Sequence, residues 1–192
     1  MKKNVRYSQI ALMFALVLLS GCGSGGPAAG GNGAPAGMRA TESAFAKEID
    51  ALQQQLVELS IGVDREEARQ VAETAVVYSQ TLAAQYRVVR PAVWHNILVR
   101  MRARERGLCY HWTTDLMRKL QSLGLTSFEL FWGVAHRGSQ LREHNSVVIA
   151  ASGQPFEAGL VLDPWRNSGE LYWAAVSQDR YPWRPLPRQL WY

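Results

Sequence analysis

Apolar residues recur every three or four positions between residues 41 and 106, the spacing of amphipathic helices. Three helices are predicted, over about 41–61, 65–86 and 91–106. The residues expected to begin them are Thr41 or Ser43, Asp64 with Glu67 in a capping box, and Pro91. Their expected buried faces consist of Phe45, Ile49, Leu52, Leu56 and Leu59; Ala68, Val71, Ala72, Ala75, Tyr78, Ser79, Leu82 and Tyr86; and Val93, Trp94, Ile97, Leu98 and Met101.

The pattern changes in the second half of the chain. A short helix is predicted to begin near Cys109 and to end before Gly124, after which apolar residues alternate with a period of two. Strands are expected around 128–134, 147–149, 160–162 and 171–175, joined by short turns. Such short connections imply an antiparallel sheet. The predicted fold class is therefore α+β, with helices over 41–107 followed by the cysteine helix and the sheet over 108–192.

The first 40 residues have a different composition. Lys2, Lys3 and Arg6 precede an apolar stretch over 10–19 that is too short to span a bilayer and has the form of a signal-peptide core. Residues 23–40 are mostly Gly, Ala, Pro, Ser and Asn, a composition typical of a flexible tether. We predict a signal peptide over 1–21, a tether over 22–40 and a single α+β domain over 41–192.

The net charge gives no reason to expect a nucleic-acid partner. The whole chain has a formal charge of +5. Residues 1–21 contain three basic residues and no acidic ones, so removing them leaves 5 − 3 = +2. The basic character therefore belongs mainly to the leader, and the domain itself is close to neutral.

The leader ends in Leu19-Ser20-Gly21-Cys22, which resembles the lipobox of bacterial lipoproteins. This resemblance implies that Cys22 carries lipid, palmitate included, becomes the first mature residue and attaches the protein to the membrane. Gly23, in place of an aspartate, resembles lipoproteins sorted to the outer membrane. The implied location is the bacterial cell envelope, on the outer membrane facing the periplasm in a Gram-negative organism.

Cys109 is the only thiol left once Cys22 is lipidated. It lies at a helix start, where free backbone N–H groups and the helix dipole favour a thiolate. His144 opens one predicted strand and Asp163 closes the next, before Pro164, so neighbouring antiparallel strands would place an imidazole beside a carboxylate. A thiol nucleophile needs a base, and the base needs a group that orients it. The alternative is a buried cysteine that acts as a small apolar residue.

The order of these three residues resembles the transglutaminase-like branch of the papain-like cysteine enzymes. The matching stretches are 107–112 (GLCYHW), 143–148 (EHNSVV) and 162–165 (LDPW). The resemblance implies a papain-like, transglutaminase-like core and a hydrolase that cleaves an amide or peptide bond through a thioester, without a cofactor. Arylamine acetyltransferases and peptidoglycan-cleaving papain-like peptidases share this order, and acyl transfer to an amine is a further alternative.

The remaining site residues are assigned with their alternatives. The backbone N–H of Cys109 and the indole of Trp94 are candidate oxyanion donors, the latter because transglutaminases use a tryptophan upstream of the cysteine. Trp112 and Trp165 are candidate cleft residues, with core packing as the alternative. His111 is a rival base, although residues two apart on a helix do not face each other. A metal site of Cys109, His111 and His144 is not favoured, because no paired-ligand spacing is present. His95 and His136 are expected at the surface or core edge.

The expected partners are the membrane, through Cys22, and a protein, peptide or peptidoglycan substrate. A different class of function is also possible, in which the protein is a non-catalytic envelope lipoprotein that uses a papain-like fold to bind a protein or the cell wall. A reactive thiol at Cys109 would distinguish the enzyme from this binding module.

Overall fold

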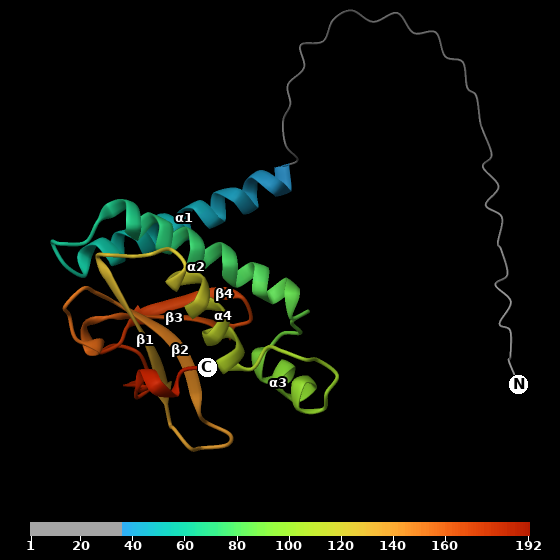
Figure 1. Ribbon diagram of the computed structural model, residues 1–192. Helices are drawn as coiled ribbons and strands as arrows, with labels where there is room; N and C mark the ends of the chain where they lie inside the picture. Colours follow the sequence, from blue (N-terminus) through green and yellow to red (C-terminus); the bar gives the residue numbers. More distant parts are fainter. Residues whose placement is uncertain (1–35) are drawn as a thin grey trace, which may run out of the picture. The chain divides into compact units, whose positions relative to one another are not determined.

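The computed structural model describes the backbone of residues 36–192 and the side chains from residue 44 on (Figure 1). The fold is a mixture of helices and one antiparallel sheet, which confirms the predicted α+β class. The helices are α1 (Ala36–Glu58), α2 (Arg65–Gln85), α3 (Ala92–Arg100) and α4 (Cys109–Gln121). The strands are β1 (Phe128–Ala135), β2 (His144–Ala151), β3 (Leu160–Asn167), β4 (Glu170–Ala175) and β5 (Arg184–Pro185). Short 3₁₀ helices cover Phe156–Ala158 and Arg188–Leu190.

The sheet has the strand order β4-β3-β2-β1-β5, and all neighbouring strands are antiparallel. β2 and β3 occupy central positions, with Val147 opposite Leu162. His144 and Asp163 therefore lie on directly paired strands, as predicted. The chain leaves β4 at one edge of the sheet and enters β5 at the other, so residues 176–183 cross the sheet between the two edges.

The two faces of the sheet are covered differently. Helices α1, α2 and α4 share one apolar core with alternate residues of the strands, including Leu116 of α4, Trp132 of β1 and Val147 of β2 (Figure 1). The other face is covered by Phe156 and by Trp183, which pack on Val148 and Val161. The period of two along each strand explains this division, since successive side chains point to opposite faces.

The first helices differ from the prediction in their ends and caps. α1 begins at Ala36 rather than at Thr41 or Ser43. Asp64 caps α2 by accepting from the backbone N–H groups of Glu66 and Glu67 at 2.8 and 2.9 Å. The reciprocal half of the capping box is absent, because the Glu67 carboxylate instead accepts hydrogen bonds from Thr126 and Ser127, immediately before β1. The predicted signal peptide and Cys22 lie outside the described residues, as does the tether up to residue 35.

Helix α3 contradicts the predicted helix in both length and orientation. It ends at Arg100, and its buried side chains are Ala92 and His95. The predicted apolar face is largely in solvent, with Val93, Trp94 and Met101 exposed. A buried histidine that is fully hydrogen-bonded replaces the apolar stripe, and periodicity alone cannot detect that substitution. Within residues 36–192, no helix is both long and apolar enough to cross a membrane.

Candidate active site

The turn before α4 is held in place by His95. Its Nδ1 accepts from the backbone N–H of Val89 at 3.2 Å, so its Nε2 carries the proton and donates to the carbonyl of Arg106 at 2.9 Å. Gly107 follows with a φ of +122°, and a Cβ at this position would overlap the His95 ring. A glycine is therefore required here both for its backbone conformation and for the close approach of the imidazole. His95 is a structural residue, deeper in the protein than expected.

His111 and Trp112 complete the support of this turn. Nδ1 of His111 accepts from the backbone N–H groups of Gly107 and Leu108 at 3.1 and 3.2 Å, so the imidazole caps the helix that contains it. Nε1 of Trp112 donates to the carbonyl of Gly107 at 2.9 Å. Burial and the nearby cation of Arg106 lower the pKa of His111 to about 4, which keeps the ring neutral and able to accept. His111 is thus a cap rather than the rival base.

Cys109 is the first residue of α4 and is half-buried. Its backbone N–H belongs to the first turn, whose N–H groups have no partner within the helix. The sulfur lies 3.8 Å from the carbonyl oxygen of Glu143 and 3.8 Å from Nδ2 of Asn145. The thiol is therefore placed at the beginning of β2, beside the residues that flank His144.

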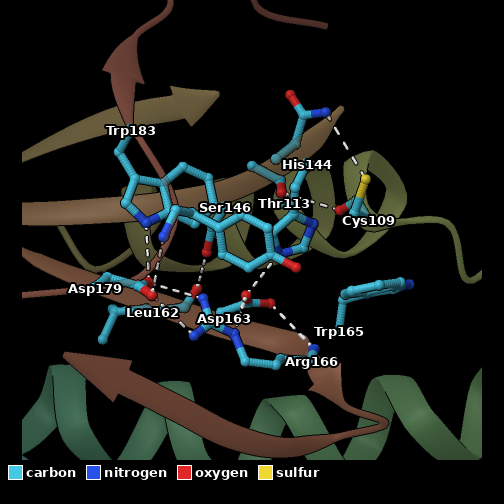
Figure 2. Close-up of polar contacts among 12 residues, drawn as sticks. Cys109, Thr113, His144, Ser146, Leu162, Asp163, Trp165, Arg166, Asp179 and Trp183 are labelled. Atoms are coloured by element: carbon cyan, nitrogen blue, oxygen red, sulfur yellow. Dashed lines mark hydrogen bonds and ion pairs between the residues drawn. The ribbon is translucent and has the colours of Figure 1, made fainter. Parts of the chain in front are cut away.

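His144 and Asp163 form a buried pair. Nε2 of His144 donates to Oδ2 of Asp163 at 2.6 Å, and both side chains are almost inaccessible to water. Burial disfavours the charged imidazolium, but the Asp163 carboxylate and the adjacent Cys109 thiol outweigh it and raise the pKa of His144 to about 9. In Figure 2 the His144 ring lies between Cys109 and Asp163. Because Nε2 is bound to the carboxylate, Nδ1 is the ring nitrogen left for the thiol.

Asp163 lies within β3 instead of closing it. The pairing of β3 with β2 ends at Leu162, before Pro164, as predicted. β3 nevertheless continues past Pro164 to Asn167, where it pairs with β4. The register of this second pairing is irregular between Asp163 and Asn167. This irregularity curls the backbone so that the N–H of Arg166 reaches Oδ1 of Asp163 at 3.2 Å. The bulge therefore supplies the carboxylate with a second fixed donor.

Arg166 joins Asp163 to a second carboxylate, Asp179. Its Nε donates to Oδ2 of Asp163 at 3.0 Å, and its two terminal nitrogens donate to both oxygens of Asp179 at 3.0 and 2.7 Å (Figure 2). Nε1 of Trp183 also donates to Asp179 at 2.9 Å. Burial disfavours the Asp179 carboxylate, but these hydrogen bonds lower the pKa of Asp179 below its ordinary value. No pattern in the sequence predicted this network, although Arg166 follows Asp163 by only three residues.

Three aromatic rings surround the imidazole. The centroids of Trp165, Tyr181 and Trp183 lie 4.7, 4.8 and 5.3 Å from that of His144. Trp165 is itself fixed, since its Nε1 donates to Oδ1 of Asn96 at 3.1 Å. The rings limit the rotation of His144 and the access of water to its bond with Asp163.

The thiol lies between two adjacent cavities. The larger, of ≈ 340 Å³, is lined by His144, Trp165 and Tyr181 among others. The smaller, of ≈ 290 Å³, is lined by Asn145, Tyr110 and Arg100 among others. Both cavities share Cys109, Asn96, Leu141 and Glu143. A substrate can therefore approach the sulfur from either side.

The structure places the other predicted site residues as follows. Trp94 is half-exposed on α3 and lines neither cavity, so its assignment as an oxyanion donor finds no support. Trp112 is buried against Tyr86, beneath the site, and is core rather than cleft. Trp165 lines the larger cavity, as does His136. Among the described residues, no three His, Cys, Asp or Glu side chains gather in a way that could hold a metal ion.

Comparison of the chain with protein-family models, with curated proteins and with solved structures finds no match. The contacts within the site are therefore the basis on which a function can be inferred. Those contacts bring together a half-buried thiol at a helix start, an imidazole with a raised pKa and a carboxylate anchored by an arginine.

Proposed function

We propose that this protein is a cysteine hydrolase that cleaves an amide or peptide bond through Cys109, His144 and Asp163. The observation that carries the proposal is the buried imidazole of His144, which donates to Asp163 at 2.6 Å and lines an open cavity together with Cys109. A thiol packed in an apolar core has neither such a base nor an entrance for substrate.

The contacts define the roles of the residues in each step. His144 takes the thiol proton of Cys109 at Nδ1. The resulting thiolate attacks the carbonyl carbon, and the π electrons of the C=O bond move onto its oxygen. When this intermediate collapses, the C–N bond breaks and Nδ1 of His144 gives its proton to the leaving nitrogen, which leaves a thioester on Cys109. Water then attacks the thioester and gives a proton to His144. When this second intermediate collapses, a carboxylic acid is released, and His144 returns the proton to the Cys109 sulfur, which restores the thiol. Asp163 orients the imidazole and stabilises its charged form throughout.

The location and substrate class are part of this proposal. Lipidation of Cys22 would hold the enzyme in the bacterial envelope, where protein, peptide and peptidoglycan all offer amide bonds. The papain-like, transglutaminase-like relationship remains a proposal based on the order of the three residues, and no cofactor is needed for the steps described.

The test uses the full chain with Cys22→Ser, because Cys109 is then the only thiol. We expect p-nitrophenyl acetate to release p-nitrophenolate and to leave an acetyl group on Cys109 that intact-mass spectrometry detects. His144→Gln and Asp163→Asn should each slow this acylation by about 10³-fold or more, whereas iodoacetamide should still alkylate the thiol in Asp163→Asn. Ser146→Ala is the control, since it removes a buried hydrogen bond from β2 to Leu162 without a contact to the thiol. Wild-type acylation rates in His144→Gln would exclude the hydrolase.

Acylation by p-nitrophenyl acetate also distinguishes the hydrolase from two alternative functions. If glycinamide accelerates loss of the acetyl group and N-acetylglycinamide appears, the enzyme is an acyltransferase at the same site. The non-catalytic binding module is favoured by the exposed Val93 and Trp94 of α3 and by Met101, which follows the helix. It predicts a thiol whose reactions do not depend on His144.

A further inference from the structure

Asn145 contacts both the candidate nucleophile and the core. It follows His144 on β2 and is nearly buried, with 8% of its surface exposed. Its Oδ1 accepts from Nε1 of Trp132 at 2.7 Å, and its Nδ2 lies 3.8 Å from the sulfur of Cys109. None of the steps described above uses this amide.

The orientation of the amide is determined by Trp132. An indole nitrogen can only donate, so the atom of Asn145 that faces it must be the oxygen. The NH₂ group therefore points toward Cys109 and toward Glu143, whose Oε1 lies 3.5 Å away. Trp132 is itself buried in the core beneath α4. A donor that is fixed in this way does not have to reorganise when charge develops beside it.

We propose that the side-chain N–H of Asn145, together with the backbone N–H of Cys109, stabilises the oxyanion formed at Cys109. This inference rests on the proposed hydrolase. The oxygen of the tetrahedral intermediate is bonded to the carbon that binds the sulfur. A donor that contacts the sulfur in the free enzyme is thus within reach of that oxygen after attack. The N–H is not left unpaired at any stage, since it moves from the sulfur to the oxygen.

The positions of His144 and Asn145 also fix the direction of the substrate. Adjacent residues of a strand point to opposite faces, and each of the two lines a different cavity beside Cys109. The leaving nitrogen must approach His144 to receive its proton, so it lies on the side of the larger, aromatic cavity. The carbonyl oxygen must approach Asn145, so it faces the smaller cavity.

The test compares two reactions of one thiolate in the full chain with Cys22→Ser. Acylation by p-nitrophenyl acetate forms an oxyanion, whereas alkylation by iodoacetamide is a direct displacement and does not. The ratio of the two rates cancels the fraction of thiolate, because both reactions consume the same species. Asn145→Ala should lower the acylation-to-alkylation ratio by about 100-fold, the effect of losing one oxyanion donor. Ser146→Ala, on the next position of β2, should leave the ratio unchanged.

A second variant keeps the test decisive if Asn145→Ala does not fold. Trp132→Phe retains an aromatic ring in the core but removes the N–H that orients the amide, so it should lower the same ratio by a smaller factor. An unchanged ratio in a folded Asn145→Ala, or in Trp132→Phe where only that variant folds, would overturn the role of Asn145 and leave the hydrolase standing. A wild-type thiol that is not acylated at all would overturn both.

Discussion

Arg166 lies against Asp163, with its Nε 3.0 Å from Oδ2 and its backbone N–H 3.2 Å from Oδ1. The same guanidinium binds both oxygens of Asp179, and the Arg166 and Asp179 side chains are 9% and 0% exposed. One guanidinium thus pairs with two buried carboxylates. Asp163 is therefore held in position, and its negative charge balanced, by Arg166 as well as by His144.

The first prediction concerns this shared cation. Arg166→Met should destabilise the protein by roughly 3–5 kcal/mol, because it leaves Asp179 buried without a counter-ion. Adding Asp179→Leu removes the orphaned charge, so the double variant should be more stable than the sum of the single effects predicts. Urea unfolding of the wild type, both single variants and the double variant measures the coupling. Strictly additive losses would contradict a shared ion-pair network.

The second prediction concerns pH and His144. Its pKa is raised to about 9 in the folded protein, above the ordinary value of 6.5. The stabilising contribution is therefore complete below about pH 6.5 and is lost as the pH rises through 9. The free energy of unfolding of the wild type, measured relative to His144→Gln, should fall over this interval by about 3 kcal/mol. A difference that stays constant from pH 6 to 9.5 would exclude the charged pair.

The third prediction concerns the turn that positions Cys109. Gly107 and Gly124 both have a positive φ, which is unfavourable for alanine. The two sites differ in space: a Cβ at Gly107 would overlap the His95 ring, whereas a Cβ at Gly124 would meet no atom. Gly124→Ala should therefore cost only about 1 kcal/mol. Gly107→Ala should cost clearly more and should also alter the rate at which iodoacetamide alkylates Cys109. Equal effects of the two variants on both measurements would show that the approach of His95 is unimportant.

The fourth prediction concerns the anchor between α2 and β1. The Glu67 carboxylate accepts from the backbone and hydroxyl groups of Thr126 and Ser127 at 2.6–3.0 Å. Burial opposes its ionisation, but these donors lower the pKa of Glu67 to about 2. Glu67→Gln should cost roughly 1–2 kcal/mol at pH 7, allowing for partial exposure.

The pH dependence of this loss provides the check. Because the pKa of Glu67 is lowered, its contribution is complete above about pH 4.5 and should disappear as the pH falls through 2. Glu66→Gln is the control, since the neighbouring acid makes no contact with β1 and should have little effect at any pH. A loss in Glu67→Gln that persists unchanged at pH 2.5 would rule out the charged anchor.

The fifth prediction concerns the membrane anchor. Cys22→Ser should abolish incorporation of labelled palmitate and leave the chain unprocessed or released, because Cys22 is the only cysteine at the end of the proposed signal peptide. Cys109→Ser should be lipidated normally. Mass spectrometry of the N-terminal peptide measures both, and an unacylated mature N-terminus elsewhere would contradict the assignment.

The local patterns were sufficient to predict the helix at Cys109 and the pairing of the strands that contain His144 and Asp163. Both follow from short-range signals: apolar residues at helical spacing that end before Gly124, and alternating apolar residues between turns. Asn145 was missed because the orientation of its amide is set by Trp132, thirteen residues away on another strand. The orientation of α3 was missed because the buried His95 is satisfied by backbone groups outside its own helix.

The residues packed around the imidazole were the part of the site that the sequence predicted least. Asp179, Tyr181 and Trp183 come from a segment without regular periodicity, and their contacts with Arg166 and His144 depend on the path of the chain across the sheet. Only the tertiary fold brings these residues together, so no local sequence pattern near Cys109 predicts their contacts.

The path of residues 176–183 across the sheet means that the side chains around His144 are completed by the C-terminal part of the chain. Residues 176–183 follow Cys109, His144 and Asp163 in the chain, and in the folded protein they cross the sheet to reach the imidazole. A chain that ends before Asp179 would contain all three proposed catalytic residues but lack Tyr181, Trp183 and the ion pair of Arg166 with Asp179. Reactivity at Cys109 should therefore require the C-terminal segment, so that an incompletely synthesised chain carries a comparatively inert cysteine.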